Sequence, residues 1–71
     1  MQNLQSGVEI LPSHLLKTYE AIPPAGKRLT AEEIAKITRR ARATEYVYLQ
    51  RLIELGYVKK YRQGRKVFFS R

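Results

Sequence analysis

The sequence predicts a single α+β domain in which three short helices are followed by a β-hairpin. Three observations indicate this fold class. A capping-box sequence marks a helix start near the middle of the chain, a later run of apolar residues at helical spacing ends at a glycine, and the last part of the chain changes to two β-prone runs around a glycine-containing turn. A chain of 71 residues has room for one such domain.

The N-terminal part is expected to contain a flexible arm, residues 1–10, ahead of a domain that spans residues 11–71. Residues 1–10 show no helical periodicity. Pro12 is expected to open the first helix, because the missing N–H of proline costs nothing in the first turn. Pro23-Pro24 ends it, because a residue before proline avoids the α region. We therefore expect a helix over residues 12–22, with one apolar face made of Leu15, Leu16, Tyr19 and Ile22.

The second helix has the strongest local start signal in the chain. Thr30 and Glu33 fit a capping box, in which the threonine is the N-cap residue and the glutamate is the third helical residue. Leu29 before the cap and Ile34 after it occupy the positions of a hydrophobic staple. We expect this helix to be about two turns long and to end near Thr38.

A third helix is expected over residues 43–55. The basic tract Arg39-Arg40-Ala41-Arg42 would form the tight turn before it. Gly56 stands where a C-terminal helix glycine belongs. Glu45 falls near the core face in the first turn, where the helix dipole stabilises a negative charge. The core face itself is expected to contain Tyr48, Leu49, Leu52 and Leu55.

The C-terminal segment predicts a β-hairpin. Residues 57–62 and 65–70 are rich in β-formers and flank the turn Gln63-Gly64. In the symmetric pairing, Val58 and Phe69 are candidates for the core. Tyr61 and Phe68 then lie together on the other face of the hairpin.

The residue inventory excludes several kinds of chemistry. The chain has no cysteine, no aspartate and a single histidine, His14, so disulfides, thiolate zinc sites, histidine-rich metal sites and a Ser-His-Asp triad are excluded. We therefore expect no enzymatic activity, no metal and no cofactor. No apolar run reaches the roughly 20 residues that a membrane span requires, and residues 1–7 do not resemble a signal peptide. The expected location is the cytoplasm.

Charge gives the strongest indication of a partner. The net charge is +8, and the isoelectric point is near 10.2. The charge is unevenly distributed: residues 1–26 have a net charge of −1, whereas residues 27–71 carry thirteen bases against four acids, a net charge of +9. Such a field attracts a polyanion, and nucleic acid is the commonest one. Solubility alone does not require all the excess charge in one part of the chain.

The order of the elements resembles the winged helix-turn-helix family over about residues 11–70, with Arg28-Leu29 as a short extended piece before the second helix. Two strings carry the resemblance, LTAEEIA at residues 29–35 and LQRLIELGYV at residues 49–58. The second string looks like the end of the recognition helix and the start of the wing in MarR-like and ArsR-like transcription regulators. The chain departs from the family in the turn between the second and third helices, where Arg39-Arg40-Ala41 replaces the usual glycine or serine.

The resemblance implies double-stranded DNA as the partner, so that within the cytoplasm the protein is expected to be associated with the nucleoid. In the family, the third helix enters the major groove and the hairpin wing, here residues 57–70, touches the backbone or the minor groove. Carried over to this chain, one face of the third helix, turned away from the core, would contact bases through Arg42, Tyr46, Val47 and Gln50. Glutamine can bond adenine, arginine can bond guanine, and valine can touch a thymine methyl. Expected backbone contacts are Arg39, Arg40 and Arg51, and expected wing contacts are Lys60, Arg62, Arg65 and Lys66.

Several alternatives remain open at this stage. The chain could be a ribosomal or other RNA-binding winged-helix protein, or a winged-helix interaction module of a larger complex. Tyr46 has a second interpretation as a packing residue, and Arg51 has one as the partner of Glu54. The hairpin bases have a second interpretation as guards of an exposed strand edge. A homodimer would use the first helix or the N-terminal arm.

Overall fold

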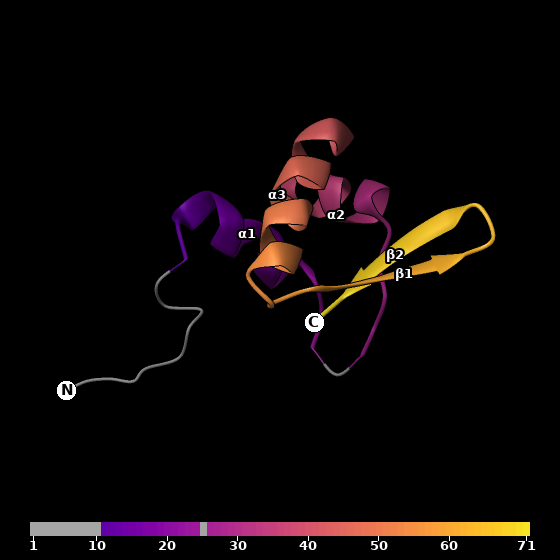
Figure 1. Ribbon diagram of the computed structural model, residues 1–71. Helices are drawn as coiled ribbons and strands as arrows, with labels where there is room; N and C mark the ends of the chain where they lie inside the picture. Colours follow the sequence, from indigo (N-terminus) through magenta and orange to yellow (C-terminus); the bar gives the residue numbers. More distant parts are fainter. Residues whose placement is uncertain (1–10, 25) are drawn as a thin grey trace.

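The computed structural model describes residues 11–24 and 26–71 (Figure 1). The expected arm over residues 1–10 lies outside the described residues. The element order is α1 (Ser13–Ala21), α2 (Ala31–Thr38), α3 (Arg42–Glu54), β1 (Lys59–Gln63) and β2 (Lys66–Ser70). Three helices followed by an antiparallel two-stranded hairpin confirm the predicted α+β fold, in a layout consistent with a winged helix.

Helix α1 begins one residue later than expected. Pro12 is the N-cap residue rather than the first helical residue, with an extended backbone at φ −56° and ψ 150°. Its carbonyl oxygen accepts hydrogen bonds from the backbone N–H groups of Leu15 and Leu16, at 3.0 and 2.9 Å. The predicted apolar face contains the buried Leu15, but it also contains a fully buried polar residue, Thr18, that the apolar pattern did not indicate.

Helix α2 has the predicted capping box. Thr30 Oγ1 accepts a hydrogen bond from the backbone N–H of Glu33 at 3.2 Å, and Glu33 Oε1 accepts one from the backbone N–H of Thr30 at 2.8 Å. The helix ends at Thr38, and its C-cap residue Arg39 adopts the left-handed conformation (φ 63°, ψ 38°) usually reserved for glycine. The turn between α2 and α3 is therefore built without glycine, by one arginine in a left-handed backbone conformation.

Helix α3 begins and ends one residue earlier than expected. Leu49 and Leu52 are fully buried, as predicted, but the placement of Leu55 in the core was wrong, since it is 43% exposed. Leu55 is the C-cap residue, and the chain reverses at Gly56, which has φ +88°. The N–H of Gly56 bonds to the carbonyl of Ile53 and the N–H of Tyr57 bonds to that of Leu52, the pattern of a Schellman motif. The predicted role of Gly56 is confirmed.

The hairpin register corrects the predicted turn by one residue. Tyr61 lies opposite Phe68 and Gln63 opposite Lys66, so the loop is Gly64-Arg65 rather than Gln63-Gly64. Gly64 has φ +62° and Arg65 does not have a positive φ, which is the pattern of a type II′ turn. This turn accommodates the right-handed twist of the two strands.

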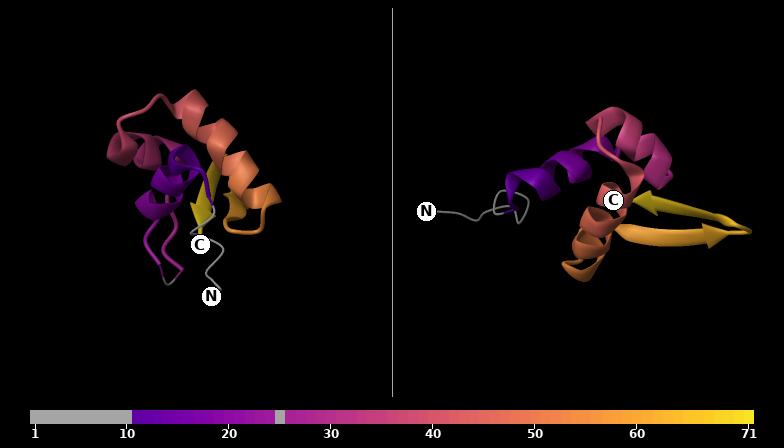
Figure 2. Two further views of the ribbon diagram at one scale, coloured as in Figure 1. Left: turned by 90° about the vertical axis from the view of Figure 1, so that its left-hand side faces the viewer. Right: turned by 90° about the horizontal axis from the view of Figure 1, so that it is seen from above.

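The extended piece at Arg28-Leu29 is confirmed as an isolated strand position beside β2. Leu29 and Phe69 exchange two backbone hydrogen bonds, of 2.9 and 2.7 Å. The bridge anchors the base of the hairpin to the segment before α2. Phe69 and Val58 are both buried, as predicted, and join the core formed by the three helices: Leu15, Ile22, Ala31, Ile34, Leu49 and Leu52. The tip of the hairpin projects away from the helices (Figures 1 and 2).

Candidate nucleic-acid interface

The predicted reading face of α3 is exposed. Arg42, Tyr46, Val47 and Gln50 all lie on the solvent side of the helix, whereas Leu49 and Leu52 on the other side are fully buried. Val47 is 66% exposed. Contact of these four side chains with bases stays a prediction.

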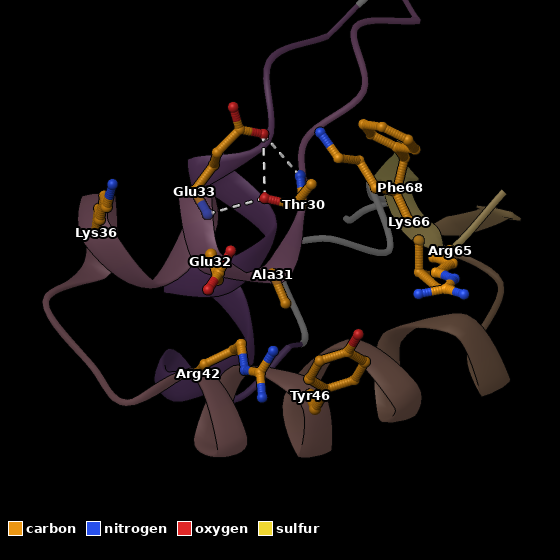
Figure 3. A pocket seen from close by; sticks show the side chains of 11 residues that line it. Thr30, Ala31, Glu32, Glu33, Lys36, Arg42, Tyr46, Arg65, Lys66 and Phe68 are labelled. Atoms are coloured by element: carbon orange, nitrogen blue, oxygen red, sulfur yellow. Dashed lines mark hydrogen bonds between the residues drawn. The ribbon is translucent and has the colours of Figure 1, made fainter. Parts of the chain in front are cut away.

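A groove joins α3 to the hairpin. Its volume is about 380 Å³, and it brings Arg42 and Tyr46 together with Arg65 and Lys66. Figure 3 shows Arg42 and Tyr46 pointing from α3 toward the first turn of α2, while Arg65 and Lys66 approach from the hairpin. Residues predicted separately as base contacts and as wing contacts thus line one concave surface. The α2 side of the groove adds Lys36 and two acids, Glu32 and Glu33.

Tyr46 takes part in packing as well as in the exposed face. Its ring lies edge-on to that of Phe69, with 5.9 Å between the ring centroids and 82° between the planes. The guanidinium carbon of Arg42 lies 6.0 Å from the centre of the Tyr46 ring. Tyr46 therefore connects the predicted reading face to the base of the hairpin, and 39% of its surface remains exposed.

A second, more open depression lies on the α1 side of α3. Its volume is about 600 Å³, and Val47 and Gln50 line it together with Arg51, His14 and Tyr48. The four predicted base contacts are therefore divided: Arg42 faces the hairpin groove, Val47 and Gln50 face this depression, and Tyr46 borders both. The spacing of the residues along the helix did not reveal this division.

Arg51 has the carboxylate partner that the sequence suggested. Arg51 Nη1 lies 3.4 Å from Glu54 Oε1, and the two side chains are 60% and 53% exposed. An exposed ion pair of this kind contributes about 0.2–1 kcal/mol, so it does not hold Arg51 away from a phosphate. Its role as a backbone contact stays a prediction.

Arg39 and Arg40 differ although they are neighbours. Arg39 is exposed in the turn. Arg40 is half-buried and its Nη1 donates hydrogen bonds inside the protein, to Thr18 Oγ1 at 2.9 Å, to the carbonyl of His14 at 3.1 Å and to Glu45 Oε2 at 3.3 Å. The Arg40 guanidinium is thus engaged in hydrogen bonds within the protein. The predicted phosphate contact of Arg40 would have to compete with these partners.

Glu45 is completely buried in the first turn of α3. Besides the bond from Arg40, its carboxylate accepts hydrogen bonds from Thr18 Oγ1 at 2.6 Å and Thr38 Oγ1 at 2.7 Å. The sequence placed Glu45 correctly near the core face and in the first turn. It did not reveal the buried polar cluster, by which we mean Glu45, Thr18, Thr38 and Arg40. The available signals were Thr18, next to Tyr19 of the predicted apolar face of the first helix, and Thr38 at the predicted end of the second helix.

The four predicted wing residues are all exposed: Lys60, Arg62, Arg65 and Lys66. Within the described residues, no carboxylate lies within 4.0 Å of them. Lys60 and Arg62 pair across the hairpin with Phe69 and Val67, whereas Lys66 pairs with Gln63 on the opposite face. Positive charge therefore covers both faces of the hairpin and its tip. Over residues 11–24 and 26–71, no helix is sufficiently long and apolar to cross a membrane.

Comparisons with known proteins identify a relative without a described activity. No protein-family model matches the chain, and no solved structure matches it. An uncharacterized protein of Archaeoglobus fulgidus is 48% identical over 59 residues, which cover 83% of this chain and 78% of the archaeal protein. This chain and the uncharacterized archaeal protein belong to one family.

Proposed function

We propose that this protein binds double-stranded DNA and acts as a small transcription regulator associated with the nucleoid. The observation that carries the proposal is the groove between α3 and the hairpin, because exposed basic side chains from both elements line it. A helix and a neighbouring hairpin that share one basic surface can contact the major groove and the adjacent backbone at the same time.

The dimensions and the charge of the surface support this function. Helix α3 has 13 residues and is about 20 Å long at 1.5 Å per residue, and the major groove is about 12 Å wide and admits an α-helix. Residues 27–71 carry a net charge of +9. In the described residues, only Arg40 and Arg51 among these bases are paired with a carboxylate. The other bases of this region, except the half-buried Arg71, are exposed and available to phosphates.

Two kinds of contact can be assigned by position. Gln50 and Val47 are exposed on α3 away from the hairpin, and they are suited to adenine edges and thymine methyl groups. Arg65 and Lys66 stand at the hairpin tip, where contacts to phosphate or to the minor groove are expected. Arg42 faces the hairpin groove and can reach either a guanine or the backbone that passes between helix and hairpin.

Selection of bound sites from a pool of random duplex DNA, with structured RNA as competitor, tests the proposal. We expect a preferred duplex sequence to be enriched and RNA to compete poorly. Lys17→Ala is the matched control, because Lys17 is an exposed base of α1 that lines neither depression. If no sequence is enriched and RNA competes as well as DNA, the ribosomal or RNA-binding alternative replaces the proposal.

A second candidate function is that of a protein-interaction module. The depression on the α1 side of α3 favours it, because Tyr46, Val47 and Tyr48 give it a mainly apolar lining, and a contiguous apolar patch is typical of protein interfaces. This candidate requires no affinity for nucleic acid. Absence of DNA and RNA binding at low salt would support it against the DNA-binding proposal.

A further inference from the structure

The buried polar cluster joins the recognition helix to the rest of the domain. We propose that Glu45 is a positioning residue that sets the rotation of α3 about its own axis, and thereby aims the DNA-reading face. The proposal rests on the proposed function. It assigns a role in DNA recognition to a residue that is 0% exposed and that cannot touch DNA.

The three hydrogen bonds to Glu45 come from three different parts of the fold. Thr18 belongs to α1, Thr38 is the last residue of α2, and Arg40 lies in the turn before α3. Thr18 and Thr38 are themselves 0% and 2% exposed. Arg40 also donates hydrogen bonds to Thr18 and to the carbonyl of His14, so two residues of α1 are bonded to the cluster. A rotation of α3 would lengthen at least one of these bonds.

The hydrogen bonds to Glu45 restrict the rotation of α3 in a way that apolar packing at this place would not. Leu49 and Leu52 bury α3 against the core, but contacts between apolar side chains depend weakly on direction. A buried charged pair contributes little to stability compared with apolar residues of similar volume, because both charges lose their hydration. Buried polar groups fix the register of packed helices in some proteins, as a single buried asparagine does in coiled coils. A polar cluster in the small core of this domain is therefore better explained by orientation than by stability.

The cluster is also adjacent to the reading face. The guanidinium carbon of Arg40 lies 5.0 Å from the centre of the Tyr48 ring. The centres of the His14 and Tyr48 rings are 4.8 Å apart. His14 and Tyr48 line the same depression as Val47 and Gln50. Glu45 immediately precedes Tyr46, so a change in the rotation of α3 at Glu45 moves all the exposed side chains of the helix together.

The decisive variant replaces the charged pair with apolar residues of similar length, Arg40→Met together with Glu45→Met. This change leaves no unpaired buried charge, so the melting temperature is expected to stay within about 10 °C of the wild-type value. Two quantities are measured on the folded variant: the orientation of α3 relative to α1, from residual dipolar couplings of backbone amides, and the ratio of affinities for the selected duplex and for random duplex.

We expect the dipolar couplings of α3 to depart from the wild-type orientation while α3 stays helical. The affinity ratio should fall by about tenfold, comparable with the loss of one base contact. Thr44→Val is the matched control, because Thr44 lies in the same helical turn and makes no side-chain hydrogen bond within the described residues. It should change neither quantity. Wild-type couplings and a wild-type affinity ratio in the apolar variant would overturn the proposal.

A second variant keeps the test decisive if the apolar variant does not fold. Thr18→Val removes the donor to Glu45 and the acceptor for Arg40 while it keeps every charge, and we expect it to shift the couplings of α3 in the same direction by a smaller amount. Unchanged couplings in Thr18→Val would contradict a positioning role. Absence of DNA binding by the wild-type protein would refute the proposed function separately, and the couplings would still report whether the cluster orients α3.

Discussion

Thr30 determines where helix α2 begins. Its side chain accepts a bond from the N–H of Glu33 while its own N–H bonds to the Glu33 carboxylate. Thr30→Ala removes the first bond and should lower the free energy of unfolding by about 1 kcal/mol. Urea unfolding monitored by circular dichroism measures the change. Ser13→Ala is the control, because α1 has no side-chain cap bond, and its effect should stay within about 0.5 kcal/mol. Equal effects of the two substitutions would contradict the capping role.

Leu52 and Leu55 allow the core face of α3 to be tested with one type of substitution. Leu52 is fully buried, and Leu52→Ala should cost about 2–5 kcal/mol of unfolding free energy because it leaves a cavity. Leu55 is 43% exposed, so Leu55→Ala should cost clearly less. Chemical unfolding of both variants gives the two values. A harmless Leu52→Ala would show that the core face of α3 has been assigned wrongly. The assignment of the reading face, on the opposite side of α3, would then lose its support.

Individual residues were predictable where the signal is local. Thr30 and Glu33 are three residues apart, so the capping pattern is visible in the sequence. The bond between Thr18 and Glu45 joins residues 27 positions apart and depends on how α1 crosses α3, which no local pattern contains. Leu55 was misplaced because helical spacing extends the apolar face past the last turn, whereas the chain reverses at Gly56.

Two elements, α3 and the hairpin, are expected to make different contacts with DNA. Gln50→Ala removes the proposed base contact of α3 and should cost about 1–3 kcal/mol at the preferred sequence while leaving random DNA unaffected. Arg65→Ala removes the proposed phosphate contact of the hairpin and should weaken binding to all sequences alike. Affinities for the preferred and random duplexes, each at two salt concentrations, distinguish the two effects. If Gln50→Ala behaves like Arg65→Ala, α3 does not read sequence.

Element positions were more predictable than the connections between them. All three helices and both strands were expected, with ends within one or two residues of those observed. The connections depended on backbone conformations that residue type predicts less well. Arg39 takes a left-handed conformation that favours glycine, and Gly64 occupies the first loop position although the sequence suggested the second. The loop position follows from strand register, which depends on how Phe69 meets the core.

At the scale of the whole molecule, the uneven charge predicts strong dependence on salt. About five or six neutralised phosphates would give a slope near −5 when the logarithm of the binding constant is plotted against that of the salt concentration. Titration of a fluorescent duplex at several salt concentrations measures the slope. Lys66→Ala should reduce its magnitude by about one, whereas Lys17→Ala, on α1, should leave it unchanged. A slope near zero would exclude binding dominated by phosphate contacts.

The overall architecture followed from the order of elements, but the shape of the candidate interface did not. Four-residue spacing placed Arg42, Tyr46 and Gln50 on one stripe. In the structure, Arg42 faces the hairpin while Gln50 faces the opposite depression. Tyr46 lies between the two, and its ring meets Phe69 at the base of the hairpin, a contact between parts of the chain that are distant in sequence.

Amide chemical-shift mapping with duplex DNA tests the central claim, the location of the DNA-binding surface, most directly. Spectra of the isotope-labelled protein are recorded as DNA is added. The largest changes are expected at the exposed residues of α3, from Arg42 to Arg51, and at the hairpin tip, from Arg62 to Lys66. Tyr19 and Tyr57, which pack against each other away from both depressions, should change little. Changes concentrated around Tyr19 and Tyr57, or no changes at low salt, would contradict the account.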